Sequence, residues 1–298
     1  MKITISGASG LIGRRLLKTL AADGHTLQVL SRHAGTNMPG GVRVAAWDPA
    51  RGEPPMEALQ DADAVIHLAG EPVAQRWSSD AKRRIRDSRV AGTTNLVRAF
   101  SKLPHAPPIL ISASAIGYYG LRGEELLTES SAPGSGFLAE VCVAWEQAAQ
   151  DAEKLAVRVV RVRTGIVLDQ RGGALAKMLP PFKMGVGGKL GNGRQWMSWI
   201  HAEDLVGMLR FALNNQVSGP MNGVSPNPVT NSDFTSALAS VLKRPALIPA
   251  PALGLKLAFG EMSEMLLGSQ RVLPKVAEAS GYRFQFTDLD AALADVVK

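Results

Sequence analysis

The feature that most constrains how this chain folds is a turn near its start that carries Gly7, Gly10 and Gly13 at three-residue spacing. Before the turn, residues 2–6 alternate polar and β-branched side chains, as a short strand does. After it, apolar side chains recur every fourth position over residues 12–20, which indicates an amphipathic helix. A strand, a glycine turn and a helix in this order are typical of the start of a doubly wound α/β domain.

A glycine turn of this kind is also suited to binding phosphate. Glycine permits a tight turn, lets backbone N–H groups approach a pyrophosphate and lets the helix pack closely on the strand. The N-terminus of the helix adds positive dipole charge. The sequence therefore predicts dinucleotide binding, although glycine turns also join strands to helices for purely structural reasons. The residues expected to contact the cofactor here are Gly7, Ser9, Gly10, Leu11, Ile12 and Gly13.

Length and composition disfavour several classes of protein. The 298 residues include 33 Lys and Arg against 26 Asp and Glu, and because this excess is spread along the chain we expect no nucleic-acid partner. A single cysteine, Cys142, allows no internal disulfide and no multi-cysteine metal site, so we expect no metal. No apolar run is long enough to cross a membrane, and the first strand leaves no room for a signal peptide. The cytoplasm is therefore the expected location.

The end of the second predicted strand indicates which cofactor is bound. This strand covers residues 26–30 and is followed by Ser31 and Arg32. In this fold an acidic residue at that place favours NAD, whereas an arginine pairs with the 2′-phosphate of NADP. Arg32 therefore predicts NADP(H), with Ser31 as a second phosphate contact. The alternative is an arginine in a solvated loop.

Further strands are predicted at residues 42–47, 64–68, 108–112 and 155–163. Parallel strands end at the edge of the sheet where ligands bind, so residues at their carboxyl ends are candidates for cofactor contacts. These candidates are Leu68, Ala69, Gly70, Thr164 and Gly165. His67 lies inside the fourth strand, where we expect a hydrogen-bonded core histidine in preference to a catalyst.

Several motifs together resemble the extended, epimerase-like branch of the short-chain dehydrogenase/reductase superfamily. They are the Gly-x-x-Gly-x-x-Gly turn, the run Arg89-Val-Ala-Gly-Thr93, and the strand end Ser112-Ala-Ser114 with Tyr118-Tyr119-Gly120 after it. Within that branch, the chain resembles a subfamily of uncharacterised epimerase-family proteins with a C-terminal domain of unknown function. This closer resemblance rests on Leu68-Ala-Gly-Glu-Pro72, Ser88-Arg89, the Trp199-Ile-His201 run and the tail from Ser269 to Phe286.

The resemblance implies a doubly wound parallel Rossmann sheet with a smaller C-terminal substrate lobe. It assigns residues 1–168 to the NADP-binding domain and residues 169–298 to the lobe, with the chain re-entering the Rossmann domain around 200–225. It also implies that Ser114 hydrogen-bonds the reacting oxygen of the substrate and that Asp48 contacts the adenine amino group. The alternative for Ser114 is a turn serine at the end of a strand.

The chain departs from the family in its catalytic residues. Arg89 stands where the family has an active-site asparagine. The family's Tyr-x-x-x-Lys, in which the lysine lowers the pKa of the tyrosine, is missing from this sequence. The tyrosine position falls at Phe137 or Leu138 and the lysine position at Val141 or Cys142. The sequence therefore predicts the fold far better than the reaction.

The predicted lobe contains a glycine-rich segment, residues 185–193, followed by several aromatic residues. Glycine turns beside Trp196, Trp199 and His201 suggest a mobile, aromatic-lined mouth over a pocket. Asp204 is expected to cap the helix that follows.

Three more helices are predicted besides the first one and the one after Asp204. Residues 78–100 and 137–152 are expected to lie side by side on one face of the sheet, and residues 253–267 read as one apolar helix. Extended family members often dimerise through the first two, so a homodimer is expected. Four basic residues would crowd that interface if they faced inward: Lys82, Arg83, Arg84 and Arg86.

Two functions remain open at this point. The first is an atypical NADP-dependent oxidoreductase or epimerase that acts on a small polar substrate without the usual Tyr-x-x-x-Lys. The second is a non-catalytic NADPH-binding sensor or interaction protein, which the missing catalytic residues favour. The candidate catalytic residues are Ser114, Tyr118, Tyr119, Arg89 and His201.

Overall fold

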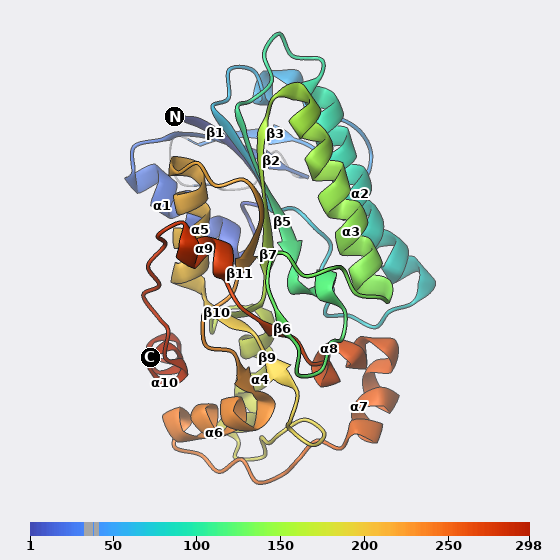
Figure 1. Ribbon diagram of the computed structural model, residues 1–298, viewed down its shortest axis with the longest axis vertical. Helices are drawn as coiled ribbons and strands as arrows, with labels where there is room; N and C mark the ends of the chain where they lie inside the picture. The colour runs from blue at the N-terminus through green and yellow to red at the C-terminus, as the bar shows by residue number, and fades with distance from the viewer. Residues whose placement is uncertain (33–37, 39–41) are drawn as a thin grey trace.

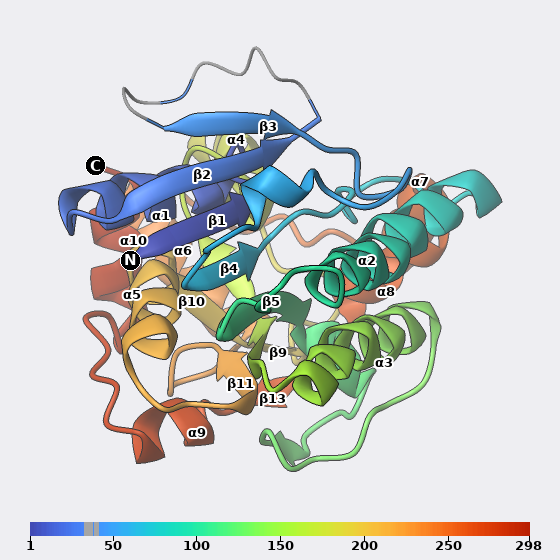
Figure 2. The same ribbon diagram turned by 90° about the horizontal axis from the view of Figure 1, so that it is seen from above.

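A sheet of parallel strands forms the centre of the protein. The computed structural model describes residues 1–32, 38 and 42–298. In this part of the chain seven strands pair in the order β11-β7-β5-β4-β1-β2-β3 (Figures 1 and 2). They are β1 (Lys2–Ser6), β2 (Thr26–Ser31), β3 (Arg43–Ala46), β4 (Ala64–His67), β5 (Ile109–Ala115), β7 (Arg158–Thr164) and β11 (Gly219–Gly223).

The strand order reverses at β1, which makes the sheet doubly wound as predicted. Ile5 of β1 pairs with Val29 of β2 on one side and with Ile66 of β4 on the other. The crevice at the carboxyl ends of β1 and β4 is therefore the topological switch point, where open α/β sheets bind their ligands.

Helices cover both faces of the sheet (Figure 2). On one face, α1 (Leu11–Ala22), α5 (Ala202–Asn214) and the short α9 (Lys275–Ala279) bury apolar side chains against the strands. On the other face, α2 (Ser79–Phe100) and α3 (Phe137–Gln150) lie side by side, as predicted. Burial on both faces explains why the strands read as nearly continuous apolar runs.

Local backbone and side-chain geometry explains where α2 and β7 begin. The Ser78 side chain accepts a hydrogen bond from the N–H of Ala81, so it caps α2 at the predicted start. The helix α3 ends at Gln150 and continues as a 3₁₀ helix, η3 (Asp151–Leu155). Ala156 then has a left-handed backbone with φ 59°, so β7 begins at Arg158, three residues later than predicted.

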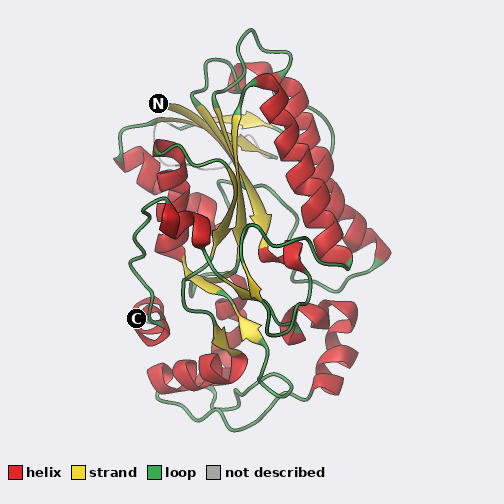
Figure 3. Ribbon diagram, in the orientation of Figure 1, coloured by secondary structure: helices red, strands yellow, loops and turns green. Residues whose placement is uncertain are grey.

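The remaining elements form a smaller lobe at the carboxyl edge of the sheet (Figure 3). Its strands are β6 (Leu126–Leu127), β8 (Ile166–Leu168), β9 (Trp196–Met197), β10 (Trp199–His201), β12 (Val229–Thr230) and β13 (Arg271–Val272). Its helices are α4 (Gly173–Lys183), α6 (Asn231–Leu242), α7 (Ala252–Phe259), α8 (Ser263–Leu267) and α10 (Leu289–Val296). Single 3₁₀ turns elsewhere are η1 (Met56–Ala58), η2 (Ile116–Tyr119) and η4 (Gly260–Met262). Between these segments the chain returns to the large sheet, since α5 packs on it and β11 pairs with β7.

The single apolar helix predicted at 253–267 is wrong. The segment breaks at Gly260, whose φ of 60° lies in the left-handed region, and η4 separates α7 from α8. The helix α7 also lies on the surface, with Leu253 and Leu257 70% and 73% exposed. Among the described residues, no helix is both long and apolar enough to span a membrane.

Candidate functional site

The glycine turn between β1 and α1 is too tightly packed for larger residues. Gly7 has φ 74°, and a Cβ atom there would lie 2.6 Å from the carbonyl carbon of Leu68 at the end of β4. At Gly13 a Cβ atom would lie 2.2 Å from the carbonyl oxygen of Gly7. These glycines therefore bring α1 and the end of β4 close together around the turn, as the motif predicts.

The N-terminus of α1 is open for an anion. Gly10 is the N-cap, so no side chain accepts a hydrogen bond from the first N–H groups, and the first turn carries no acidic residue. Uncapped N–H groups and the positive end of the helix dipole suit a phosphate. The segment before α4 lies beside this end, because Gly172 packs near the Leu11 side chain. The residues present thus fit the pyrophosphate of a dinucleotide.

The expected adenosine end lies at the ends of β2 and β3. Ser31 is the last residue of β2, and the exposed Arg32 follows it. No carboxylate in the described segments pairs with Arg32. Asp48, by contrast, accepts a hydrogen bond from the N–H of Ala50 at 3.1 Å and pairs with Arg51 at 3.2 Å. The Asp48 carboxylate therefore stabilises the turn after β3, and its contact with adenine stays a prediction.

Leu68, Ala69 and Gly70 continue β4 beside the glycine turn. The N–H of Leu68 donates to the carbonyl of Ser6. His67 is fully buried, with Nδ1 2.5 Å from the Ser6 hydroxyl. Burial, and to a lesser degree the charge of Arg89, lowers its pKa to about 4. His67 is a core histidine as predicted, but only half of its hydrogen bonding is satisfied, because Nε2 has no partner in the described structure.

Thr164 and Gly165 lie where the sheet passes into the lobe. Thr164 is the last residue of β7, and Gly165 donates its N–H to the carbonyl of Gly223 at the end of β11. The chain then enters β8, which pairs with β10. Both residues thus reach the carboxyl edge, where the sequence places them.

The Ser114 hydroxyl is bound within the protein. It donates to Glu146 on α3 at 2.7 Å, and the side chains of both residues are buried. Arg163 on β7 binds the same carboxylate through two nitrogens at 2.7 and 2.8 Å. Although burial acts against the charge, these bonds raise the pKa of Arg163. Ser114 therefore reaches the predicted strand end, where its hydroxyl points to a buried ion pair.

The two tyrosines after Ser114 occupy different environments. Tyr119 is fully buried, accepts a hydrogen bond from Arg163 and donates to Asn222 at 2.6 Å. Burial raises its pKa to about 12, although Arg163 acts in the opposite direction, so Tyr119 is poorly suited to proton transfer near neutrality. Tyr118 is half-buried, and the Arg163 guanidinium lies 3.5 Å from its ring centroid. Its hydroxyl has no hydrogen-bond partner in the described structure.

The helix α3 offers no proton-transfer pair at the positions where the family has one. Phe137 packs edge-on against Trp77. Leu138 and Cys142 lie one turn apart beside Gly117, in the loop that carries Tyr118. Burial raises the pKa of the Cys142 thiol to about 12, so this group is neutral at physiological pH.

Arg89 projects from α2 toward the segment after β4. Its Nη1 donates to the carbonyl oxygens of Glu71 at 2.9 Å and Ile85 at 3.1 Å. A Cβ atom at Gly70 would lie 3.1 Å from the guanidinium carbon. The same carbon lies 5.1 Å from the ring centroid of Trp145 on α3. Arg89 thus reaches the carboxyl edge between α2 and α3.

His201 makes no contact with the other candidate catalytic residues in the described structure. Its Nδ1 accepts a hydrogen bond from the N–H of Glu203, so His201 is the N-cap of α5, and its ring stacks on Phe286 at 3.9 Å. Its Nε2 lies 3.4 Å from Asp295 on α10. Burial lowers its pKa. None of these contacts is shared with Ser114, so the structure shows His201 joining α5 to the C-terminal segment.

Two predictions about the lobe need correction. Asp204 does not cap α5: it is the third residue of the helix and accepts hydrogen bonds from the N–H groups of Gln285 and Phe286. Trp199 and His201 do not line an open mouth, since they are 0% and 2% exposed. Their aromatic rings pack in the interior of the lobe and stabilise it.

Sequence reasoning missed the ion pair that holds Ser114. No sequence motif predicts a role for Glu146, and Arg163 is predicted only as the last residue of the strand at 155–163. One signal was present in the sequence: Arg158, Arg161 and Arg163 interrupt an apolar strand, and a charge within a buried strand requires a partner.

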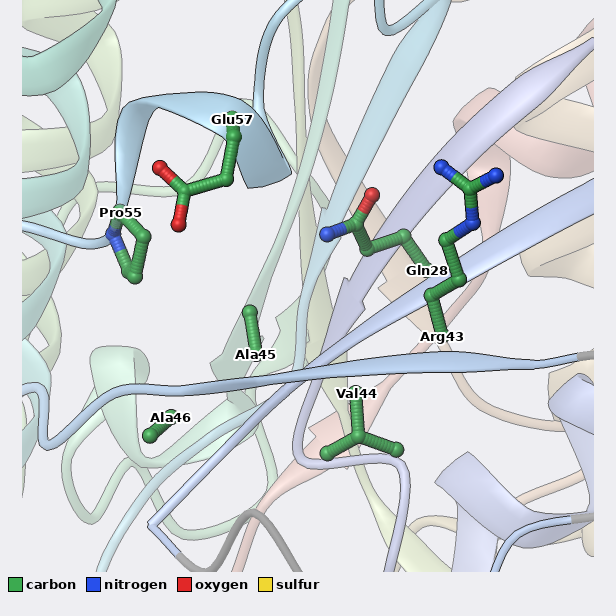
Figure 4. A pocket seen from close by; sticks show the side chains of 7 residues that line it. All are labelled: Gln28, Arg43, Val44, Ala45, Ala46, Pro55 and Glu57. Atoms are coloured by element: carbon green, nitrogen blue, oxygen red, sulfur yellow. The ribbon is translucent and has the colours of Figure 1, made fainter.

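The described residues also line two cavities outside the glycine turn. One, of about 630 Å³, lies against β2, β3 and η1, where Gln28, Arg43 and Glu57 surround it (Figure 4). The other, of about 360 Å³, lies between the glycine-rich segment and the helices α7 and α8, with Gln195 and Lys256 among its lining residues. The second cavity belongs to the lobe that is expected to hold the substrate.

Comparisons with known proteins agree with this geometry. Residues 3–224 match the NAD dependent epimerase/dehydratase family, and residues 250–296 match the domain of unknown function DUF1731. The epimerase family protein Mb2239 of Mycobacterium bovis is 42% identical over 98% of this chain and 96% of its own length. The epimerase family protein YfhF of Bacillus subtilis is 38% identical over 100% and 98%. The crystal structure of human epimerase family protein SDR39U1 with NADPH has a TM-score of 0.87 and 34% identity, covering 99% of each chain.

Proposed function

Because this chain belongs to the NAD dependent epimerase/dehydratase family and carries its C-terminal DUF1731 domain, we propose that it binds NADP(H) at the carboxyl edge of the sheet. The single observation that carries the proposal is the uncapped N-terminus of α1 behind the glycine turn. Arg32 at the end of β2 supports NADP(H) over NAD(H). A human relative that is 34% identical was solved with NADPH. The lone, buried Cys142 suits a reducing compartment such as the cytoplasm.

We further propose that the protein is an atypical oxidoreductase or epimerase for a small polar substrate. The bound cofactor would supply the hydride chemistry. The N-terminus of α1 would hold the pyrophosphate, and residues at the carboxyl ends of β4 and β5, with Ser114 and Tyr118 after them, would border the rest of the cofactor. Tyr118 is the proposed proton donor or acceptor, because its hydroxyl has no described partner while that of Tyr119 is bound on both sides.

Proton transfer at this site should be slow. The usual family members rely on a lysine to depress the pKa of the tyrosine, and α3 carries the neutral Cys142 at that turn. The loss of a positioned acid or base typically reduces a rate by about a hundred- to ten-thousandfold. We therefore expect weak activity, or activity on a substrate that supplies its own acidic proton.

The second candidate function is a non-catalytic NADPH sensor. The observation that favours it is the bond from Ser114 to Glu146, which occupies the hydroxyl that would otherwise bind the reacting oxygen. In this alternative, the residues that bind the cofactor keep their role. The residues at the family's catalytic positions serve only to stabilise the fold.

Turnover measurements distinguish the two functions. Purified protein would be incubated with NADPH and a panel of carbonyl compounds and nucleotide sugars, and cofactor oxidation and sugar isomers would be followed. The enzyme proposal expects slow turnover that Tyr118→Phe abolishes and Tyr119→Phe retains. Saturable NADPH binding with no turnover across the panel supports the sensor. Vigorous turnover of an ordinary sugar nucleotide would contradict the expected weak proton transfer.

A further inference from the structure

Arg89 is a partly buried cation without a matching carboxylate. Its Nη1 is held by the carbonyl oxygens of Glu71 and Ile85, and its guanidinium packs near Gly70 and the Trp145 ring. The Glu71 carboxylate instead pairs with Arg84 at 3.4 Å. Partial burial lowers the pKa of the Arg89 guanidinium, because the cation has lost part of its hydration. Within the described chain, a charge in such a place lacks the ionic partner that buried charges normally have.

The unused donors of Arg89 remain available to a ligand. Its Nε and Nη2 make no hydrogen bond to described residues, yet they are not among the buried atoms that lack a partner, so they are in contact with solvent. The two bonds at Nη1 fix the plane of the guanidinium. A preorganised guanidinium with free N–H groups suits hydroxyl or phosphate oxygens.

The topology shows which part of a dinucleotide would meet these donors. A pyrophosphate bound at the N-terminus of α1 would lie between the ends of β1 and β4, and the adenosine half would extend toward β2 and Arg32. The other half must then extend past the end of β4 in the opposite direction along the sheet edge. Gly70, against which Arg89 packs, lies three residues beyond the end of β4 on that side.

We propose that Arg89 binds the nicotinamide-side half of the cofactor, with Nε and Nη2 donating to oxygens of its ribose or of the adjoining phosphate. This inference rests on the proposed NADP(H) binding and extends it to a residue on the opposite side of the switch point from Arg32. The cation comes from α2 and reaches toward α3, where the Trp145 ring centroid lies 5.1 Å from the guanidinium carbon.

The proposal can be tested by comparing NADPH with a ligand that has only the adenosine half of the cofactor. The dissociation constants of NADPH and of 2′,5′-ADP, which lacks the nicotinamide half, would be measured by calorimetry for the wild type and for Arg89→Gln. We expect Arg89→Gln to weaken NADPH about tenfold or more, as for the loss of a charge-assisted hydrogen bond, and to leave 2′,5′-ADP unchanged. The matched control is Arg86→Gln, an exposed residue of the same helix.

The possible results of these binding measurements either support or overturn the role of Arg89. If Arg89→Gln does not fold, the same two ligands are compared in Arg89→Lys, which keeps the charge but loses the fixed plane and should weaken NADPH alone by a smaller factor. Equal loss for both ligands, or no loss for either, overturns the role of Arg89 and leaves the proposed NADP(H) binding intact. A wild type that binds neither ligand refutes the proposed function and this inference with it.

Discussion

The Glu146 carboxylate determines what Ser114 can do. It accepts hydrogen bonds from the Ser114 hydroxyl and from two nitrogens of Arg163, and all three side chains are buried. Removal of one member of a buried ion pair leaves an uncompensated charge and typically costs about 3 to 5 kcal/mol. The pair is therefore fixed, and the serine hydroxyl could bind a substrate oxygen only by giving up its bond to the carboxylate.

The lowered pKa of His67 predicts a loss of stability in acid. The histidine has a pKa of about 4 in the folded protein and about 6.5 when unfolded, so between these values the unfolded chain binds more protons. The free energy of unfolding must then fall as the pH drops from 6.5 toward 4. At pH 5 this amounts to about 2 kcal/mol relative to pH 7.

Urea denaturation of the wild type and of His67→Gln at pH 7 and pH 5 measures this contribution. His201 is also buried with a lowered pKa, so it adds to the pH dependence of both proteins equally. The wild type should lose about 2 kcal/mol more than the variant over this range. Parallel losses in the two proteins would show that His67 does not titrate as the structure requires.

At the scale of elements, Asp204 fastens the C-terminal segment to α5. Its carboxylate accepts hydrogen bonds from the N–H groups of Gln285 and Phe286 at 2.8 and 2.9 Å and lies 3.2 Å from the Tyr282 hydroxyl. Burial raises the pKa of Tyr282, which keeps this phenol protonated as a donor. The segment that follows leads into α10, which packs on α6.

We expect Asp204→Asn to release this segment selectively. Hydrogen bonds to a charged group contribute about 1.5 to 3 kcal/mol, and the amide can accept fewer of them. Amide hydrogen exchange should therefore accelerate in residues 282–298 while β1 and β5 stay protected. The exposed Asp290 in the first turn of α10 provides the control, Asp290→Asn. Uniformly faster exchange over the whole chain would instead indicate global destabilisation.

Elements with local signals were predictable from the sequence, whereas those set by distant partners were not. The glycine turn and the Ser78 cap are local, and both elements begin where predicted. The cap predicted at Asp204 was wrong because its partners lie about eighty residues further along the chain. The helix predicted at 253–267 was wrong because an apolar pattern does not reveal that Gly260 adopts a left-handed backbone.

The same reasoning applies to the candidate site. Strand ends at a sheet edge follow from the topology, so the residues near the glycine turn could be named in advance. The contacts of Ser114 with Glu146 and of Arg89 with Trp145 join separate elements, and only the packed structure brings them together. The role of Tyr118 was left open by the sequence for the same reason.

At the scale of the whole molecule, we propose a homodimer through α2 and α3. The two helices form one side of the molecule (Figures 1 and 2), and Val143 is an apolar residue exposed on α3. The outer surface of α2 carries the exposed Arg83 and Arg86. A two-fold axis would place these charges near their own copies, and salt screens such repulsion.

Dimerisation should therefore strengthen as salt rises from about 0.05 to about 0.5 M. Sedimentation velocity at tens of micromolar measures the dissociation constant at each salt concentration. Arg86→Glu should reduce the salt dependence, and Val143→Glu should weaken the dimer at every salt concentration. A wild type that stays monomeric throughout would exclude this interface.

We propose that the whole carboxyl edge, from Arg32 to Arg89, is an NADP(H) site. The most direct test is titration of the wild type with NADPH and with NADH, followed by cofactor fluorescence. We predict one site per chain and about ten- to a hundredfold tighter binding of NADPH, because only its 2′-phosphate reaches Arg32. Arg32→Ala should abolish this preference. Arg98→Ala, which removes an exposed arginine of α2 that pairs with Glu53, should retain it. Equal affinity for the two cofactors, or no saturable binding, would contradict the account.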